Sequence, residues 1–249
     1  MKTKMKKYTF LLLSLVLATT FNSFAQNSET NRSSIMTFQY VKTESIDING
    51  TKFYYRKLGE SKGVPVIFLN HLGATLDNCD PRIMDGIASK HQIIAFDNRG
   101  VGATEGTTPL TIAEMAKDAR AFIHALGYEK VDLMGFSMGA FIIQEILLQE
   151  PRLARKVIMT GTGPAGGEGI KDVTKITYFD MFRGFLTFRD PKFYLFFNQN
   201  ENGKKSAKEF LARIKERTED RDKNMRLRSF SNQLKAIHAW GYRPHRIYR

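Results

Sequence analysis

The sequence predicts an α/β fold: a doubly wound, mostly parallel sheet with a helical cap after its sixth strand. Strand-like and helix-like segments alternate from Val64 to Gly163, which is the order that builds parallel sheets covered by helices. The strand-like segments are short apolar runs, as expected of strands buried on both faces. After Gly163 no buried strand is predicted and aromatic residues crowd the chain. With 249 residues, 42% of them hydrophobic, the chain is long enough for one sizeable domain.

A hairpin opens the predicted sheet, and alternating elements follow it. Residues 38–50 and 51–60 are predicted strands that meet at Asn49-Gly50, a dipeptide typical of tight hairpin turns. Further strands are predicted at residues 64–70, 91–97, 131–137 and 156–163, and helices at residues 75–90, 111–127 and 138–149. The helix at 111–127 has apolar residues at helical spacing and ends at a glycine, and the helix at 138–149 stops before a proline.

The segment after Gly163 has a different composition. Residues 171–200 contain nine aromatic residues, and residues 204–240 are predicted to form one or two helices with an apolar stripe. The expected organisation is a signal peptide (1–25), a disordered spacer (26–36), an α/β core (37–165), a helical cap (166–240) and a basic tail (241–249).

The N-terminus is typical of an exported protein. Four lysines precede an apolar run over residues 8–18, which is too short to span a bilayer, and Ser23 and Ala25 supply the small residues of a cleavage site. We expect cleavage before Gln26 and a secreted or periplasmic protein, the alternative being a retained anchor. No cysteine follows the apolar run closely, which argues against a lipoprotein. Cys79 is the only cysteine, so no intrachain disulfide can form.

Positive charge is concentrated towards the C-terminus. The formal net charge is +13, and residues 199–249 hold fourteen Lys/Arg against six Asp/Glu. This skew is compatible with a nucleic-acid or anionic-surface patch. Because both signs of charge alternate at helical spacing and no nucleic-acid motif accompanies them, we interpret the segment as a solvated helical face.

The stretch from Gly135 to Gly139, GFSMG, matches the pattern G-x-S-x-G. The pattern is weak by itself, but here it falls where a predicted strand becomes a predicted helix. At such a turn a serine is held in a strained conformation with its hydroxyl exposed, and side chains at the two glycine positions would collide with neighbouring elements. The amides at the start of the helix would face developing negative charge. These features make Ser137 a candidate nucleophile.

Two loops follow strands at the same predicted edge of the sheet. Residues 69–73 (LNHLG) offer backbone amides near Ser137, and residues 96–102 (FDNRGVG) form a glycine-rich loop. His71 could act as a base, but a histidine at a strand end more often organises a loop, and we favour that role. For Arg99 we favour a structural role in backbone or carboxylate bonds. A dinucleotide site is disfavoured, because no G-x-G-x-x-G opens a helix after the first buried strand.

Together, the segments FLNHLG, FDNRGVG and GFSMGAF resemble the α/β-hydrolase fold family, in its esterase, lactonase and haloperoxidase-like branch. The resemblance covers roughly residues 38–240. It implies that Ser137 is the nucleophile, that the backbone amides of Met138 and Leu72 hold the oxyanion, and that the aromatic segment caps the substrate pocket. A serine at this turn, rather than an aspartate, implies acyl transfer.

The resemblance does not supply a base and an acid to activate the serine. The family places its acid after a seventh strand and its histidine after an eighth, and this sequence has no match to either strand. No motif supports a substitute for either group. The candidate bases are His238 and His245, and the candidate acids are Glu168 and Asp172. We expect the sixth strand to form an unpaired edge. The unusual texture of residues 241–249 suggests a chain cut short or changed in reading frame.

The leading hypothesis is an exported serine hydrolase that cleaves a small or medium acyl substrate, such as an ester, thioester or lactone. No metal or organic cofactor is implied, since no ligand cluster has suitable spacing. The expected partner is a small molecule, with no nucleic acid and no stable membrane anchor; the oligomeric state stays open. The alternative is a catalytically inactive, truncated member or a binding module.

Overall fold

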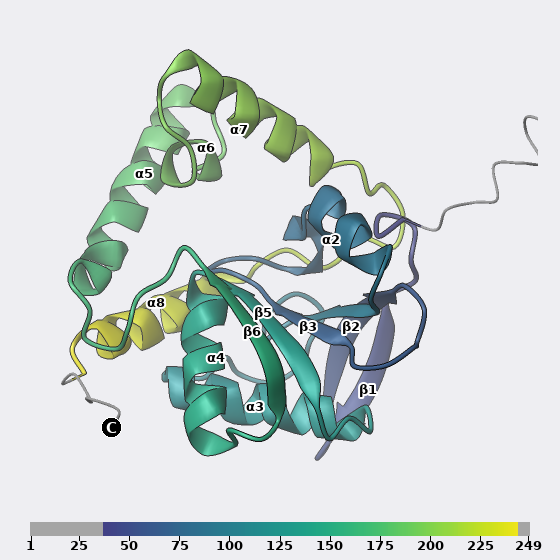
Figure 1. The fold of residues 1–249 in the computed structure, drawn as a ribbon. Helices are drawn as coiled ribbons and strands as arrows, with labels where there is room; N and C mark the ends of the chain where they lie inside the picture. The colour runs from purple at the N-terminus through teal and green to yellow at the C-terminus, as the bar shows by residue number, and fades with distance from the viewer. Residues whose placement is uncertain (1–36, 244–249) are drawn as a thin grey trace, which may run out of the picture. The chain divides into compact units, whose positions relative to one another are not determined.

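The structure, a computed structural model, describes residues 37–243. Its six strands form one sheet in the order β1-β2-β4-β3-β5-β6 (Figure 1). The strands are β1 (Glu44–Ile48), β2 (Thr51–Leu58), β3 (Val66–Leu69), β4 (Ile93–Phe96), β5 (Val131–Phe136) and β6 (Ala154–Thr160). The helices are η1 (Leu76–Asn78), α2 (Pro81–Ala88), α3 (Ile112–Ala125), α4 (Met138–Gln149), η2 (Ile170–Asp172), α5 (Val173–Thr187), α6 (Lys192–Leu195), α7 (Glu201–Arg213) and α8 (Leu227–Gly241).

The predicted hairpin and the parallel part of the sheet are both confirmed. β1 and β2 are antiparallel, and they join at Asn49 and Gly50, whose φ values of 52° and 79° are those of a type I′ turn. β2 also pairs with β4 in the antiparallel sense, whereas β4, β3, β5 and β6 run parallel. The predicted fold class, an α/β sheet that is mostly parallel and flanked by helices, is therefore correct.

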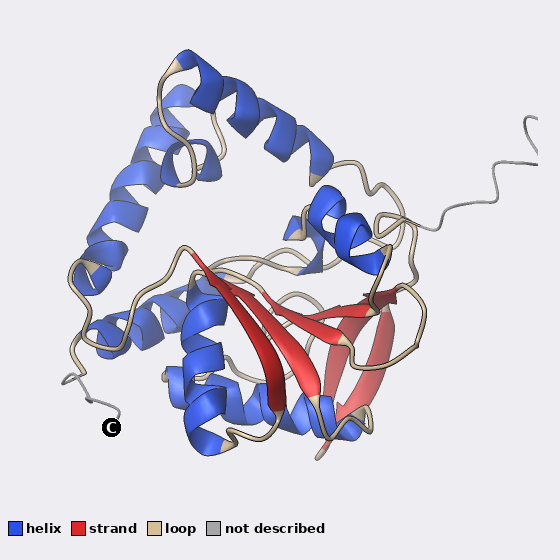
Figure 2. Cartoon of the chain, in the orientation of Figure 1, coloured by secondary structure: helices blue, strands red, loops and turns tan. Residues whose placement is uncertain are grey.

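Helices cover both faces of the sheet (Figure 2). On one face, α3 and α4 pack against alternate residues of the central strands, such as Ile67 and Leu133, in the main hydrophobic core. On the other face, α2 packs against the intervening residues, such as Phe68 and Ala95. This division follows from the two-residue period of a strand, which sends successive side chains to opposite faces. It also explains why the strands are continuous apolar runs.

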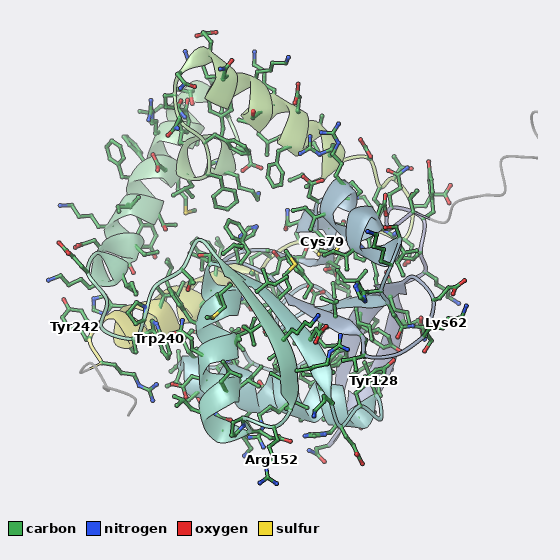
Figure 3. The ribbon with its side chains drawn as sticks, viewed as in Figure 1. Lys62, Cys79, Tyr128, Arg152, Trp240 and Tyr242 are labelled. Carbon is green, nitrogen blue, oxygen red and sulfur yellow. The ribbon has the colours of Figure 1, made fainter. Side chains whose placement is uncertain are left out.

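The buried Cys79 lies in the cluster on the α2 face (Figure 3). Burial raises the pKa of its thiol above the usual value. The thiolate, which is the reactive form of cysteine, is therefore disfavoured there. We interpret Cys79 as a core residue.

β6 is an edge strand in the described part of the chain, as the sequence predicted. It pairs with β5 on one side only. Ile158 and Met159 on this strand are 54% and 43% exposed. An apolar strand with free hydrogen-bonding groups along one side is a site where other chains can add.

Two predicted boundaries were wrong. The helix expected over residues 75–90 is interrupted: the 3₁₀ turn η1 is followed by Asp80 in extended conformation and then by α2. The cause is Pro81, because the residue before a proline is pushed out of the helical region. Asp80 instead caps α2, accepting a hydrogen bond from the Arg82 amide at 3.0 Å. The first strand begins at Glu44, and residues 37–40 form a turn.

Four helices follow the sheet, α5 to α8, and the predicted region of residues 204–240 contains two of them. The last helix, α8, packs into the main core, where its Trp240 stacks on Phe141 of α4 with ring centroids 5.5 Å apart. Figure 3 labels Trp240 on α8. α5, α6 and α7 lie apart from the strands in Figure 1. The chain therefore leaves the sheet after β6 and returns to it with α8.

The predicted signal peptide, the spacer, His245 and most of the basic tail lie outside the described residues. Within residues 37–243 no helix is long and apolar enough to cross a membrane.

Candidate active site

Ser137 lies between β5, which ends at Phe136, and α4, which begins at Met138. Its φ and ψ are 54° and −116°, a conformation that side chains other than glycine rarely adopt. Such strain persists only where the surrounding structure enforces it, and it is typical of functional sites. The junction thus has the geometry that the G-x-S-x-G pattern predicted.

The two flanking glycines are required by close backbone contacts. A Cβ atom at Gly135 would lie 2.7 Å from the backbone nitrogen of Ala140 in α4. A Cβ atom at Gly139 would overlap the carbonyl group of Leu69 at the end of β3. A side chain at either position would push the strand and the helix apart and would displace the serine between them.

Ser137 lines a cavity of about 440 Å³ between the sheet edge and the helices that follow β6. The lining is mostly apolar and includes residues from β5, α5, α6 and α8. Its members are His71, Leu72, Gly73, Phe136, Ser137, Gly161, Val173, Ile176, Thr177, Met181, Asp190, Pro191, Lys192, Leu195, Phe196 and Phe230. A cavity of this size suits a small molecule.

The sequence predicted that the backbone amides of Leu72 and Met138 form an oxyanion hole; Leu72 lines the cavity, whereas Met138 is fully buried. In the loop after β3, the amide of His71 donates to Asn70 Oδ1 at 3.0 Å, and the amide of Gly73 donates to Gln233 Oε1 at 2.9 Å. Between them, the amide of Leu72 has no acceptor among the described residues. Met138 is the first residue of α4, where a helix leaves its amides unpaired. The two amides predicted for an oxyanion hole are therefore both free of other bonds in the described part of the chain.

His71 organises the loop that carries the Leu72 amide. Its Nδ1 lies 2.7 Å from the carbonyl oxygen of Leu72, and because a carbonyl can only accept, Nδ1 carries the proton. The ring is 4% exposed and meets Phe136 and Phe196 edge to face at centroid distances of 5.4 and 4.9 Å. Burial lowers the pKa of His71 to about 4. The imidazole is therefore neutral at pH 7, and its hydrogen bond supports the role of loop organiser.

The other candidate bases and acids are not brought to Ser137. His238 is exposed on α8 and lies against the ring of Tyr242, with centroids 4.7 Å apart. Glu168 and Asp172 are also exposed. None of these three lines the Ser137 cavity. Within residues 37–243 no hydrogen bond from the Ser137 hydroxyl to a histidine or carboxylate is present.

The structure brings charged and polar groups to the site that sequence reasoning missed. Asp190 and Lys192 line the cavity and form an ion pair, with Nζ 3.1 Å from Oδ2. Gln233, which is fully buried on α8, holds the loop after β3 through the Gly73 amide. No sequence signal could have indicated them, because their positions depend on how the helices after β6 fold back over the sheet edge.

The glycine-rich loop after β4 serves the architecture. Arg99 Nε donates to Asp118 Oδ2 of α3 at 2.8 Å, which confirms the structural role favoured for this arginine. Asp97 is buried beside Asp222, and burial together with the nearby carboxylate raises the pKa of Asp97 well above its usual value. Oδ atoms of both residues accept from the Leu76 amide, at 3.0 and 3.2 Å, so this contact fastens the segment between α7 and α8 to the core.

Comparison with known proteins decides the family. The family model described as alpha/beta hydrolase fold matches residues 64–242, which is more than half of the chain. The chain belongs to the α/β-hydrolase fold family. The solved structure of an alpha/beta hydrolase fold protein from Chitinophaga pinensis is 37% identical and superposes with a TM-score of 0.79, covering 84% of this chain and 75% of that protein.

Curated relatives of the chain are named as haloperoxidases and hydrolases. A putative non-heme bromoperoxidase of Mycobacterium tuberculosis is 35% identical over 101 residues, which are 40% of this chain and 38% of that protein. A putative carbamate hydrolase of Agrobacterium fabrum is 33% identical over 98 residues, 38% of this chain and 37% of that protein. The matches thus span less than half the length of these two relatives.

Proposed function

We propose that this α/β-hydrolase is an exported serine hydrolase that cleaves a small or medium acyl compound, such as an ester, thioester or lactone. The observation that carries the proposal is the strained backbone of Ser137, at a strand-to-helix turn beside a mostly apolar cavity. A hydroxyl fixed in this way is free to attack a carbonyl carbon held in the cavity.

In the proposed reaction Ser137 Oγ attacks the acyl carbonyl, and the carbonyl oxygen becomes an oxyanion. The amides of Met138 and Leu72 donate hydrogen bonds to it, and the N-terminal end of α4 adds a favourable dipole. The bond from the acyl carbon to the leaving group then breaks, and the leaving group takes up the proton that Ser137 lost, directly or through water. Water attacks the acyl-serine, releases the carboxylic acid and returns the proton to Ser137. Removing one such donor in other serine hydrolases costs a factor of about 10² to 10³ in rate, so the two amides are central to the proposal.

A second function is favoured by a specific observation. Within residues 37–243 the only histidine that lines the Ser137 cavity is His71, whose Nδ1 proton is engaged and whose pKa is lowered to about 4. Such an imidazole is a weak base at neutral pH. A serine without an effective base retains binding and oxyanion contacts but loses most of its reactivity. The second candidate is therefore a protein that binds acyl compounds in this cavity without turning them over.

Hydrolysis of p-nitrophenyl esters tests the two functions. For a hydrolase, we expect turnover of acetate and butyrate esters that falls to the buffer rate in Ser137→Ala. Ser206→Ala, which changes an exposed serine on α7, is the matched control and should leave the rate unchanged. Folded wild-type protein that binds butyrate in calorimetry but hydrolyses no ester would favour the binding function. Equal turnover by wild type and Ser137→Ala would contradict the proposal.

A further inference from the structure

Helix α5 presents an aromatic face to solvent. Three phenylalanines on it, Phe179, Phe182 and Phe185, are 64%, 60% and 76% exposed, and Leu186 is 59% exposed. Phe188, directly after the helix, is 97% exposed. We call these five residues the aromatic face. Apolar side chains gathered on one exposed surface are uncommon in soluble proteins and mark interaction sites.

The aromatic face is not the side of α5 that meets the cavity. The cavity side consists of Val173, Ile176, Thr177 and Met181, at the helical spacing of three and four residues. At 100° per residue, Phe179 and Leu186 lie about 140–180° around the helix from Thr177 and Met181, and Phe182 lies about 100–140° from them. Phe185, one turn after Met181, lies at the border between the two sides. In Figure 1, α5 runs between α8 and α6, apart from the strands. Cavity packing therefore does not account for the aromatic face.

Basic residues flank the aromatic face along the chain. Lys171, Lys175, Arg183 and Arg189 are exposed, whereas Asp172 is the one exposed acid between residues 171 and 189. The remaining acid of α5, Asp180, is buried. Exposed apolar rings flanked by lysine and arginine complement a bilayer surface with anionic headgroups, where the rings enter the headgroup boundary and the cations meet the phosphates.

The same charges disfavour a second copy of this chain as the occupant. If α5 packed against α5 of another copy, the basic residues of the two helices would lie close together with few acids to offset them. Like charges across an interface cost free energy.

Two of the cations are held in place by aromatic rings. The Arg183 guanidinium lies 4.0 Å from the ring centre of Tyr194, and that of Arg189 lies 4.4 Å from the ring centre of Phe193.

We propose that the aromatic face docks the protein reversibly on an anionic lipid bilayer. Docking would place α5 flat on the membrane, with the rings of the aromatic face at the headgroup boundary and the Ser137 cavity on the opposite side of the same helix. The inference goes beyond the proposed function and does not depend on it, because binding to lipid requires no activity of Ser137.

Vesicle sedimentation tests the proposal with phosphatidylcholine vesicles, with and without phosphatidylglycerol. The chain from Gln26 is used, because the apolar run at residues 8–18 would itself bind lipid and the described residues belong to one compact unit without it. We expect binding to vesicles that contain phosphatidylglycerol, weaker binding to phosphatidylcholine alone, and a steep decrease with salt.

Variants identify the surface. The double variant Phe182→Ser, Phe185→Ser should lower partitioning of the protein onto anionic vesicles by about tenfold or more. Phe188→Asn should lower it by a smaller factor. Leu227→Ser, at an apolar position of α8 that is 83% exposed, is the matched control and should bind as wild type does. The double variant Lys171→Gln, Lys175→Gln should reduce binding to anionic vesicles. The double variant Lys117→Gln, Lys130→Gln, which removes two exposed lysines elsewhere, is its control and should bind as wild type does.

Circular dichroism and urea unfolding confirm that each variant is folded. Absence of binding to anionic vesicles by the wild type would overturn the proposal, as would equal binding by the phenylalanine variant and the Leu227 control. A third outcome is that the wild type does not bind lipid but forms a concentration-dependent dimer, and that the phenylalanine variant is monomeric. That outcome would assign the aromatic face to contact with a second copy of the chain. None of these three outcomes bears on ester hydrolysis, so the proposed function can still be tested by itself if lipid binding is not found.

Discussion

Single residues at the β5–α4 junction determine how closely the backbone elements approach. Ser137 holds a positive φ of 54°, and the close approach of the backbone to Gly135 and Gly139 is possible only because these two residues have no side chains. The pattern G-x-S-x-G could be recognised in the sequence because each of its fixed positions has its own steric or chemical requirement. The polar residues opposite the serine have no such local requirement, which is why Asp190 and Lys192 were missed.

Gly139→Ala tests the steric requirement. The added methyl group would overlap the Leu69 carbonyl, so strand β3 or helix α4 must shift, and we expect a loss of about 1–3 kcal/mol in the free energy of unfolding. Urea denaturation measures it. Gly86→Ala is the control, because no atom lies near a Cβ at that position of α2 and alanine favours a helix. Equal stability of the two variants would show that the junction tolerates a side chain.

The protonation of His71 is a second prediction at this scale. Burial lowers the pKa of His71 from 6.5 to about 4. Between these two pH values the ring is neutral in the folded protein but protonated in the unfolded chain. Because protons then bind preferentially to the unfolded chain, the free energy of unfolding is highest above about pH 6.5 and decreases as the pH falls towards 4. An NMR titration of the His71 ring protons should show no transition between pH 8 and about 5. A transition near pH 6.5 would contradict the buried, neutral imidazole.

At the scale of elements, local sequence determined the sheet and the helices that cover it. Helix α4 was predicted over its full observed range, because the glycine turn and Pro151 mark its two ends. The helix over residues 75–90 was predicted too long, because the apolar pattern was given more weight than the effect of Pro81 on Asp80. The arrangement of α5 to α7 could not be predicted, since apolar residues surround α5, with Val173 and Met181 on the side opposite Phe179, and leave no single stripe to orient it.

The exposed edge of β6 makes a prediction about association. Ile158→Lys should slow heat-induced aggregation several-fold, because a charge on an edge strand opposes addition of another strand. The free energy of unfolding should change little, since the side chain is 54% exposed. Ile83→Lys, at a position of α2 that is 44% exposed, is the matched control. Light scattering during heating measures both, and equal aggregation of the two variants would argue against the β6 edge as the contact.

At the scale of the whole molecule, the sequence predicted the α/β-hydrolase fold family and the comparisons confirm it. The sequence offered no supported base or acid for Ser137, and within residues 37–243 the structure brings none of the candidates His238, Glu168 and Asp172 to the serine cavity. Within the described residues the structure supplies free amides, a strained serine and a cavity, and one neutral histidine that holds a loop.

Export is the whole-molecule prediction that rests on the N-terminus. Expression in a Gram-negative host should release a shorter protein into the periplasm, with Gln26 as its first residue. Edman or mass-spectrometric analysis of the N-terminus measures it. Ala25→Arg, which removes the small residue before the cut, should block cleavage. Recovery of the uncleaved chain in the cytoplasm would rule out export.

Labelling with a fluorophosphonate tests most directly whether Ser137 is an activated nucleophile. The reagent forms a stable adduct with a serine that can be deprotonated at an oxyanion site, and peptide mapping by mass spectrometry locates it. We predict one adduct, on the peptide that contains Ser137, absent from Ser137→Ala and present in Ser206→Ala. A folded protein that stays unlabelled, or an adduct on another residue, would contradict the account.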